Sequence, residues 1–332
     1  MMETIVVTGG CGYIGCKLVP ALLNKGFSVK VIDRLYFGKN LPDSVLSSPS
    51  FELVEADICD DSAVARALEG ASGVIHLAAV ANDPSAELDP ELTRSVNLDA
   101  SLALLSRAQA SGVRRFVNAS TATVYGVRDE PDVDESFEHR PITLYGKYKS
   151  ETDQATAAAN GASFVTVNLR SATVCGWSPR MRLDLTVNIL TEQAKNRGRI
   201  TVHGGAQKRP NIVVDDLVRA YLQAFEAPAG RVGGQSFNIS ASNRSVLEIA
   251  ETVARVVNPD AAIEVAPIID LRSYHISTQR AADVLGFRAE LDVEDGARQV
   301  ADAIDSGRLP SPSDARYRNV ETLKAWSLTA AQ

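Results

Sequence analysis

The sequence has few cysteines, no excess of positive charge and no long hydrophobic run. Its four cysteines form no Cys-x-x-Cys pair and no histidine pair accompanies them at zinc spacing, so we expect reduced thiols and no metal site. The 332 residues carry 34 basic and 41 acidic side chains. A general binder of nucleic acid or of an anionic membrane would carry the opposite balance. No apolar stretch is long enough to span a bilayer.

The first residues also lack the pattern of a secretory signal. The chain enters an apolar β-branched run, Ile5 to Thr8, with no basic segment followed by a longer apolar core before it. We therefore expect a cytoplasmic protein. The length of the chain and its apolar content of 45% fit two domains, or one large α/β unit with an added lobe.

A glycine-rich turn follows that first apolar run. Gly9-Gly10-Cys11-Gly12-Tyr13-Ile14-Gly15 leads into apolar residues at helical spacing, which end at Gly26. Strand, glycine turn and helix form the context of a dinucleotide site, because glycines admit a pyrophosphate and the helix N-terminus offers it free N–H groups. A second apolar run ends at Asp33, whose carboxylate can accept ribose hydroxyls. An ordinary tight turn would not require that acid at that spacing.

Strand-like and helix-like segments alternate regularly through the first half of the chain. In order, they cover residues 51–54, 61–68, 73–77, 91–110, 115–118, 143–160 and 164–169. This alternation implies right-handed βαβ crossovers, and it predicts an α/β fold with a Rossmann-type doubly wound parallel sheet.

The pattern weakens after Gly176, where proline, arginine and glycine become frequent. We expect residues 1–176 to form the dinucleotide-binding domain. Residues 211–240 are predicted to return to that domain, because the run Ser236 to Ile239 reads as another strand of its sheet. The remaining segments, 177–210 and 241–332, are predicted to form a smaller C-terminal α/β substrate lobe.

Two later stretches carry side chains suited to acid–base chemistry. Ser120 and Thr121 follow the strand predicted at 115–118 and lie at the sheet edge where such folds bind ligands. Tyr145 and Lys149 are four residues apart on a predicted helix, hence on one face. A lysine ammonium near a phenol lowers its pKa, which makes Tyr145 a candidate base for an alcohol or sugar hydroxyl. Alone the pair could be ordinary helix surface, but behind a dinucleotide turn it indicates catalysis.

The motifs together resemble the extended short-chain dehydrogenase/reductases of the nucleotide-sugar epimerase/dehydratase group, over nearly the whole chain. The matching segments are Thr8 to Gly15, Asp57-Ile58, His76 to Ala79, Ser120 to Gly126 and Tyr145 to Lys149. The resemblance implies an NAD-dependent enzyme in which Tyr145 is the base, Lys149 contacts the nicotinamide ribose and Thr121 contacts the sugar oxygen. The cofactor-binding residues that it implies are Gly9, Gly12, Tyr13, Ile14, Gly15, Asp33, Arg34, Asp57, Ile58, Leu77, Ala78, Ala79, Ser120, Tyr145 and Lys149.

The choice of cofactor depends on two neighbouring side chains. Asp33 would repel a 2′-phosphate, so we expect NAD to bind more tightly than NADP. Arg34 acts against this preference, because an adjacent guanidinium could pair with the same phosphate.

Similarity to UDP-galactose 4-epimerases implies that hydride leaves a sugar carbon and returns to the other face of a keto-sugar. Dehydratases and decarboxylases of the group carry acidic residues just after the catalytic threonine, whereas this chain has Ala122-Thr123. We therefore expect NAD-dependent epimerisation of a nucleotide-activated sugar at C4. The alternatives are a keto-sugar reductase that consumes NAD(P)H, and a non-catalytic NAD-binding regulator.

The resemblance also implies substrate-binding residues in the second half. Arg209 and Arg272 match arginines that grip the nucleotide diphosphate, and Asn188 resembles an amide that binds it; surface arginines are the alternative reading. Thr173 stands where the 4-epimerases carry an asparagine. Arg180 and Arg182 nearby could compensate for that missing amide, select another sugar, or form a surface charge pair.

The expected assembly is a homodimer through the helices near Glu91–Ala110 and Thr143–Asn160, by resemblance and with four helices meeting across a two-fold axis. The expected partner is a nucleotide-sugar substrate, with no nucleic acid and no membrane.

Overall fold

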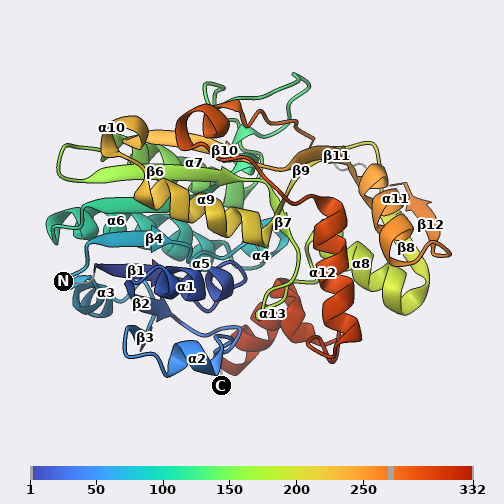
Figure 1. Cartoon of the computed structure of the whole chain (residues 1–332), viewed down its shortest axis with the longest axis horizontal. Coiled ribbons are helices and arrows are strands. Elements are labelled where there is room, and N and C mark those ends of the chain that lie inside the picture. The colour runs from blue at the N-terminus through green and yellow to red at the C-terminus, as the bar shows by residue number, and fades with distance from the viewer. Residues whose placement is uncertain (1–2, 268–272, 331–332) are drawn as a thin grey trace.

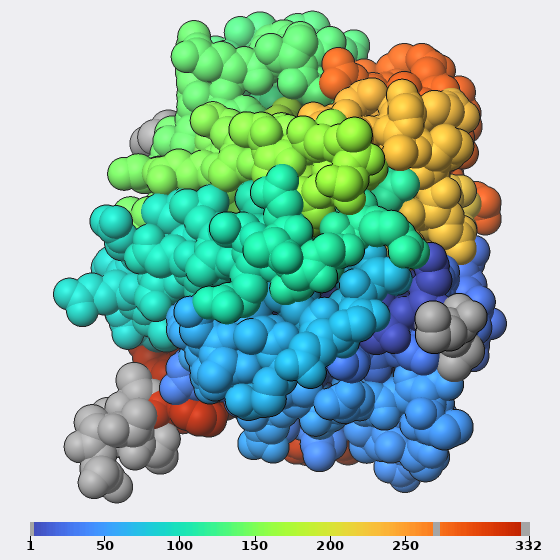
Figure 2. Space-filling view, turned by 90° about the vertical axis from the view of Figure 1, so that its left-hand side faces the viewer, coloured from blue at the N-terminus to red at the C-terminus, as the bar shows by residue number. Residues whose placement is uncertain are grey.

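The computed structural model describes residues 3–267 and 273–330. At its centre is a seven-stranded sheet in the order β10-β6-β5-β4-β1-β2-β3, in which every neighbouring pair is parallel. These strands are β1 (Thr4–Thr8), β2 (Ser28–Asp33), β3 (Phe51–Glu55), β4 (Gly73–His76), β5 (Arg115–Thr121), β6 (Val165–Ser171) and β10 (Gln235–Ile239). The predicted doubly wound α/β fold is confirmed. Figure 2 shows blue, cyan and green segments of the chain lying one above another on this face of the molecule.

Helices cover both faces of the sheet (Figure 1). On one face α1 (Gly15–Asn24) and α9 (Val214–Glu226) bury Leu18, Leu22 and Leu217 against the strands. On the other face α3 (Asp61–Leu68), α6 (Ser101–Ala110) and α7 (Leu144–Ala158) complete a second apolar cluster. The strands are buried on both faces because each βα unit returns its helix to the sheet.

The helix predicted over 91–110 is interrupted. It consists of α5 (Pro90–Arg94), a π-helical turn (Ser95–Ala100) and α6. The turn lies at the buried Asn97, whose amide accepts from Val80 N and donates to Val80 O, at 2.8 and 2.9 Å. The Asn97 carbonyl accepts from Thr152 Oγ1 at 3.0 Å, so the wider turn joins α7 and the chain after β4 through one polar residue.

The second half builds a lobe beside the carboxyl edge of the sheet. Its strands are β7 (Thr173–Cys175), β8 (Arg199–His203), β9 (Lys208–Val213), β11 (Ser242–Ser245) and β12 (Ala262–Ala266). They form a three-stranded sheet, β11-β9-β7, and a parallel pair, β12-β8. Within residues 211–240, β10 joins the main sheet and α9 packs against it, whereas β9 belongs to the lobe, where it pairs with β7 and β11.

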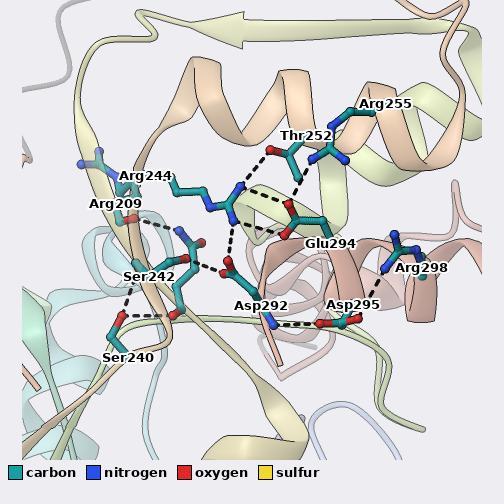
Figure 3. A network of polar contacts seen from close by, with 11 residues as sticks. Arg209, Ser240, Ser242, Arg244, Thr252, Arg255, Asp292, Glu294, Asp295 and Arg298 are labelled. Carbon is teal, nitrogen blue, oxygen red and sulfur yellow. Dashed lines mark hydrogen bonds and ion pairs between the residues drawn. The ribbon is translucent and has the colours of Figure 1, made fainter. Parts of the chain in front are cut away.

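The lobe is closed by α8 (Thr186–Arg197), α11 (Val246–Val257) and α12 (Val293–Asp305). Arg244 on β11 lies between Thr252 of α11 and the acidic start of α12 (Figure 3). Its guanidinium pairs with Asp292 and with Glu294, and Glu294 also accepts from Arg255 at 3.0 Å. This polar network joins three elements of the lobe.

Several short elements complete the described chain. They are α2 (Asp43–Leu46), α4 (Asp83–Leu88), α10 (Ala229–Val232), single helical turns at Ala122–Tyr125, Ala281–Leu285 and Ala315–Tyr317, and the C-terminal helix α13 (Asn319–Ala330). In Figure 1 the red helix α13 returns toward the blue segment after β2, where Trp326 meets Tyr36. Over 3–267 and 273–330, the structure contains no helix with the length and apolarity to cross a membrane.

Candidate active site

A cavity of about 210 Å³ opens at the carboxyl edge of the sheet, next to the glycine turn. It is lined by the residues that follow β1, β2, β3 and β4, as the strand order requires of a site at this edge. Of the predicted cofactor-binding residues, those found in its lining are Gly9, Gly12, Tyr13, Ile14, Gly15, Asp33, Arg34, Asp57, Ile58, Leu77, Ala78 and Ala79.

The glycine turn is shaped so that the backbone itself faces the cavity. Gly9 has φ +70°, and a Cβ there would lie 2.8 Å from the backbone nitrogen of Ala78. A Cβ on Gly15 would lie 2.5 Å from the carbonyl oxygen of Gly10. Helix α1 begins at this point without a side-chain cap and without an acidic residue in its first turn. The positive end of α1 is therefore available to an anion, as a dinucleotide pyrophosphate requires.

Asp33 is held at the end of β2 by the turn that it faces. Its Oδ2 accepts from the Cys11 N–H at 2.9 Å and its Oδ1 from the Leu35 N–H at 2.7 Å. Burial raises the pKa of Asp33, and these two hydrogen bonds act against that rise. The carboxylate lines the cavity in a fixed orientation, where it can still accept from ribose hydroxyls.

Arg34 is bound to a carboxylate of the chain. It pairs with Asp57, which also accepts from the Cys59 N–H at 2.9 Å. Burial on its own raises the pKa of Asp57, but the bonds from Cys59 and Arg34 outweigh burial and lower it. A guanidinium held in this way would have to leave Asp57 before it could pair with a 2′-phosphate.

The three predicted catalytic residues meet at the end of β5. Thr121 is the last residue of that strand, and Tyr145 and Lys149 lie in the first half of α7. Thr121 is near enough to the Tyr145 phenol to lower its pKa, and Lys149 Nζ donates to the Ala119 carbonyl at 2.9 Å. A hydroxyl, a phenol and an ammonium group are thus gathered beside one strand end.

The expectation that Lys149 lowers the pKa of Tyr145 is wrong for the chain alone. Burial, followed by the Asp83 carboxylate, raises the pKa of the phenol to about 12, and the cation that opposes this rise is Arg182. Lys149 is itself buried, which lowers its pKa to about 8. Its ammonium is directed to the Ala119 carbonyl rather than to the phenol, and this explains the difference.

The residues next to Thr121 contribute hydroxyl groups but no acid. Ser120 is buried, and its Oγ has no hydrogen-bond partner among the residues that the structure describes. Ala122 is fully buried, and Thr123 Oγ1 lies 2.6 Å from Thr121 Oγ1. The hydroxyls can orient an oxygen of a ligand, but at neutral pH the alanine and threonines cannot exchange a proton as a carboxylate can.

Asn188 is fully engaged within the chain. Its amide donates to Tyr13 OH at 3.1 Å and to the Arg182 carbonyl at 2.9 Å, and its Oδ1 accepts from the Gly176 N–H at 3.0 Å. Asn188 thus joins α8 to the glycine turn, and a diphosphate would have to compete for these bonds.

The other predicted substrate residues are spread over the lobe. Thr173 begins β7 and is half-buried. Arg209 lies on β9 and is largely buried, and in Figure 3 its guanidinium is turned away from the Arg244 network. Arg272 lies outside the described residues. The structure places Thr173 and Arg209 on the paired strands β7 and β9.

Other residues of the cavity were not among the predicted cofactor ligands. Tyr36 and Phe37 follow β2, Arg180 and Arg182 follow β7, and Asn319 and Leu323 belong to α13. From the sequence, Arg180 and Arg182 were considered only in connection with the substrate. Helix α13 carries no motif, so the sequence held no signal that it returns to this cavity.

Comparisons with known proteins agree with this geometry. A family model described as "NAD dependent epimerase/dehydratase family" matches residues 5–240. The chain is 31% identical over 306 residues to a UDP-glucose 4-epimerase of Mycolicibacterium smegmatis, covering 89% of this chain and 96% of that one. It is 30% identical to UDP-glucuronic acid decarboxylase 1 of Arabidopsis thaliana, covering 90% and 69%. The solved structure of MoeE5 in complex with UDP-glucuronic acid and NAD has a TM-score of 0.80 and 28% identity, covering 92% and 100%.

Proposed function

The chain belongs to the NAD dependent epimerase/dehydratase family, and from this premise we propose that it epimerises a nucleotide-activated sugar at C4. The observation that carries the proposal is the meeting of Thr121, Tyr145 and Lys149 at the end of β5, the strand next to β4, whose following residues line the cavity. A similar UDP-glucose 4-epimerase and a similar structure with a bound UDP-sugar support the choice of substrate class.

The cavity fits NAD by its own chemistry. The bare backbone between Gly9 and Gly15 and the uncapped start of α1 suit a pyrophosphate, and Asp33 and Asp57 suit the adenosine. In its oxidised form, bound NAD supplies a hydride acceptor and a positive charge near the reacting sugar. Asp33 favours NAD over NADP, because it would repel a 2′-phosphate and Arg34 is occupied by Asp57.

Tyr145 holds and returns the proton of the sugar hydroxyl in this proposal. At neutral pH its phenol is protonated in the chain alone, since its pKa is about 12, so the site must lower that pKa before proton transfer. Thr121 lies near the phenol and can bind the same sugar oxygen. Lys149 contacts the Ala119 carbonyl from one helical turn further on, where it can bind a ribose hydroxyl.

The side chains after Thr121 argue against dehydration and decarboxylation. Loss of water needs a further acid and base at the sugar, but this position holds a buried alanine and a threonine bonded to Thr121. Reversible oxidation and reduction at one carbon needs no such group. A reductase that acts on a keto-sugar would use the same three residues and would consume NAD(P)H.

Arg209, Arg272 and Asn188 are proposed ligands of the nucleotide diphosphate, and Thr173 is proposed to affect the placement of the diphosphate or of the sugar. Guanidinium groups match phosphate oxygens in two-bond geometry. The protein is proposed to act in the cytoplasm, where nucleotide sugars and NAD are available.

A screen of UDP-, dTDP-, GDP- and CDP-hexoses and hexuronates tests the function. Each sugar is incubated with the protein and NAD, and products are separated by chromatography. We expect interconversion of one C4-epimer pair without net change in NADH absorbance, and none with Tyr145→Phe. Stoichiometric NADH consumption by a keto-sugar would instead identify a reductase, and release of CO₂ from a glucuronate would identify a decarboxylase. NAD binding without turnover of any sugar would favour a regulator.

A further inference from the structure

Arg180 is a buried cation without an anionic partner. Its side chain is 3% exposed, and it makes no ion pair with any residue in 3–267 or 273–330. Nη2 donates to Asn319 Oδ1 at 2.6 Å and Nη1 to the Met181 carbonyl at 3.1 Å, while Nε has no hydrogen-bond partner there. Both acceptors are neutral, and a buried charge is costly unless an opposite charge compensates it.

The segment that carries Arg180 is fastened to the start of α1. Ser178 Oγ donates to the Tyr13 carbonyl at 2.7 Å, and the Arg180 backbone is near enough to the Cys16 thiol, in the first turn of the helix, to act on its pKa. The Arg180 side chain lines the same cavity as Gly12 and Gly15. The guanidinium and the positive end of α1 therefore border one space.

No carboxylate is in direct contact with the Arg180 guanidinium among the residues that the structure describes. Arg182, which also lines the cavity, is paired with Asp184 at 3.0 Å. Asp184 and Asp33 attract Arg180 from a greater distance, but neither forms an ion pair with it. Burial, followed by repulsion from Arg182, lowers the pKa of Arg180 to about 9, against the attraction of Asp184. An anion in the cavity could pair with the guanidinium directly.

We propose that Arg180 binds the pyrophosphate of the dinucleotide from the side opposite the glycine turn, and that Asn319 of α13 positions its guanidinium. The proposal rests on the cofactor named in the proposed function. The Arg180 guanidinium lies between Phe37 and Asn319. Its central carbon is 3.9 Å from the centroid of the Phe37 ring, and Nη2 donates to Asn319. Asn319 lies beyond residue 240, where the match to the family model ends.

Calorimetric titration with ADP-ribose, NAD and NADP tests the contact without any sugar substrate. Arg180→Met should weaken all three ligands about 10- to 100-fold, the range for a hydrogen bond to a charged group. Arg128→Met is the matched control, because Arg128 is also buried and donates to backbone carbonyls but does not line the cavity. Unchanged affinity in a folded Arg180→Met protein would overturn the proposal. A loss of affinity for NADP alone would also overturn the proposal, since that result would place the guanidinium at a 2′-phosphate.

Asn319→Asp provides a second test that does not require Arg180 to be removed. It puts a carboxylate where Nη2 already donates, so the buried cation is neutralised within the chain. We expect thermal stability to be kept or raised while ADP-ribose affinity falls, a combination that a purely structural role for Arg180 would not give. Affinity equal to wild type would refute the proposal and leave the proposed function intact. A wild-type chain that bound no ADP-ribose would refute both.

Discussion

Two charged side chains of opposite sign act on the pKa of the Tyr145 phenol. Burial and the Asp83 carboxylate raise its pKa to about 12, and the Arg182 guanidinium opposes them. Asp83 is held in place by Thr143, the residue that also caps α7, at 2.7 Å. The N-terminus of the helix that carries the phenol thus also fixes the carboxylate that acts on it.

Tyr145→Phe should leave the fold and NAD affinity nearly unchanged but reduce kcat about 10²- to 10⁴-fold, the usual contribution of proton transfer. Thr121→Ala should cost less, because it removes a hydrogen bond and not the base. Tyr148→Phe is the control on the same helix, since Tyr148 is not among the groups that act on the Tyr145 phenol. Initial rates on the identified sugar measure the effect. Wild-type rates for Tyr145→Phe would rule out this base.

The pH dependence of turnover should move in opposite directions for two variants. Arg182→Met removes a charge that lowers the pKa of Tyr145, so the phenolate forms at higher pH and the rising limb of kcat shifts upward. Asp83→Asn removes a charge that raises the same pKa, so the limb shifts downward. Rates from pH 6 to 10 give both limbs. Shifts of the same sign in both variants would contradict this account of the phenol.

Among the elements, the C-terminal helix α13 contributes side chains to the wall of the cofactor site. Leu323 lines the cavity. Trp326 meets Tyr36 edge to face with ring centroids 4.7 Å apart, and the Arg34 guanidinium lies 4.8 Å from the Tyr36 ring. The helix therefore packs against the segment after β2 that carries an adenosine-side residue.

A chain that stops at Arg318 should fold but bind NAD more weakly, because it lacks the Leu323 wall and the Asn319 contact to Arg180. The sequence has two tryptophans, Trp177 and Trp326, so Trp177→Phe leaves a single reporter on α13. In that variant, NADH should quench Trp326 fluorescence by energy transfer. Equal NAD affinity for the full and shortened chains, with no quenching, would show that α13 does not take part in binding.

The elements differ in how well the sequence predicts them, for physical reasons. Helix α3 was predicted with its observed bounds, since Asp60 caps it through bonds to Ser62 and Ala63 and its apolar residues recur at helical spacing. The glycine turn was predicted for the same local reason. The π turn at Asn97 was not, because it depends on bonds to Val80 and Thr152, which are distant in sequence.

The candidate site was predicted where it rests on motifs and missed where it rests on tertiary contacts. Thr121, Tyr145 and Lys149 lie on neighbouring elements, and the fold brings them together. The pairing of Arg180 with Asn319, 139 residues apart, has no local signature. The effect of Arg182 on the pKa of Tyr145 has no local signature either, and from the sequence we assigned that effect to Lys149.

For the whole molecule, the carboxyl edge of the parallel sheet determines where chemistry takes place. The cavity combines residues after β1, β2, β3 and β4, and the three candidate catalytic residues lie at the end of β5. Tyr13 OH donates to the Gly176 carbonyl at 2.5 Å, and Lys17 pairs with Asp215 at 2.8 Å. Contacts from α1 therefore hold the later segments of the chain over the glycine turn.

The assembly expected from the resemblance is a homodimer through α6 and α7. The exposed side chains of α6 include Ala103, Ser106 and Gln109, and those of α7 include Lys147 and Glu151. Small residues allow two helices to approach closely, and polar ones can pair across a two-fold axis. This surface is less apolar than an obligate interface, so we expect a dimer that dissociates on dilution.

Light scattering at micromolar concentration should give twice the 35.5 kDa chain mass. Ala103→Glu places a charge on the exposed face of α6, and the two-fold axis repeats that charge on the partner, so this variant should be monomeric. Ala229→Glu, on the exposed surface of α10, is the control and should remain dimeric. A monomeric wild-type mass would exclude the dimer. A dimer that survives Ala103→Glu would place the interface away from α6.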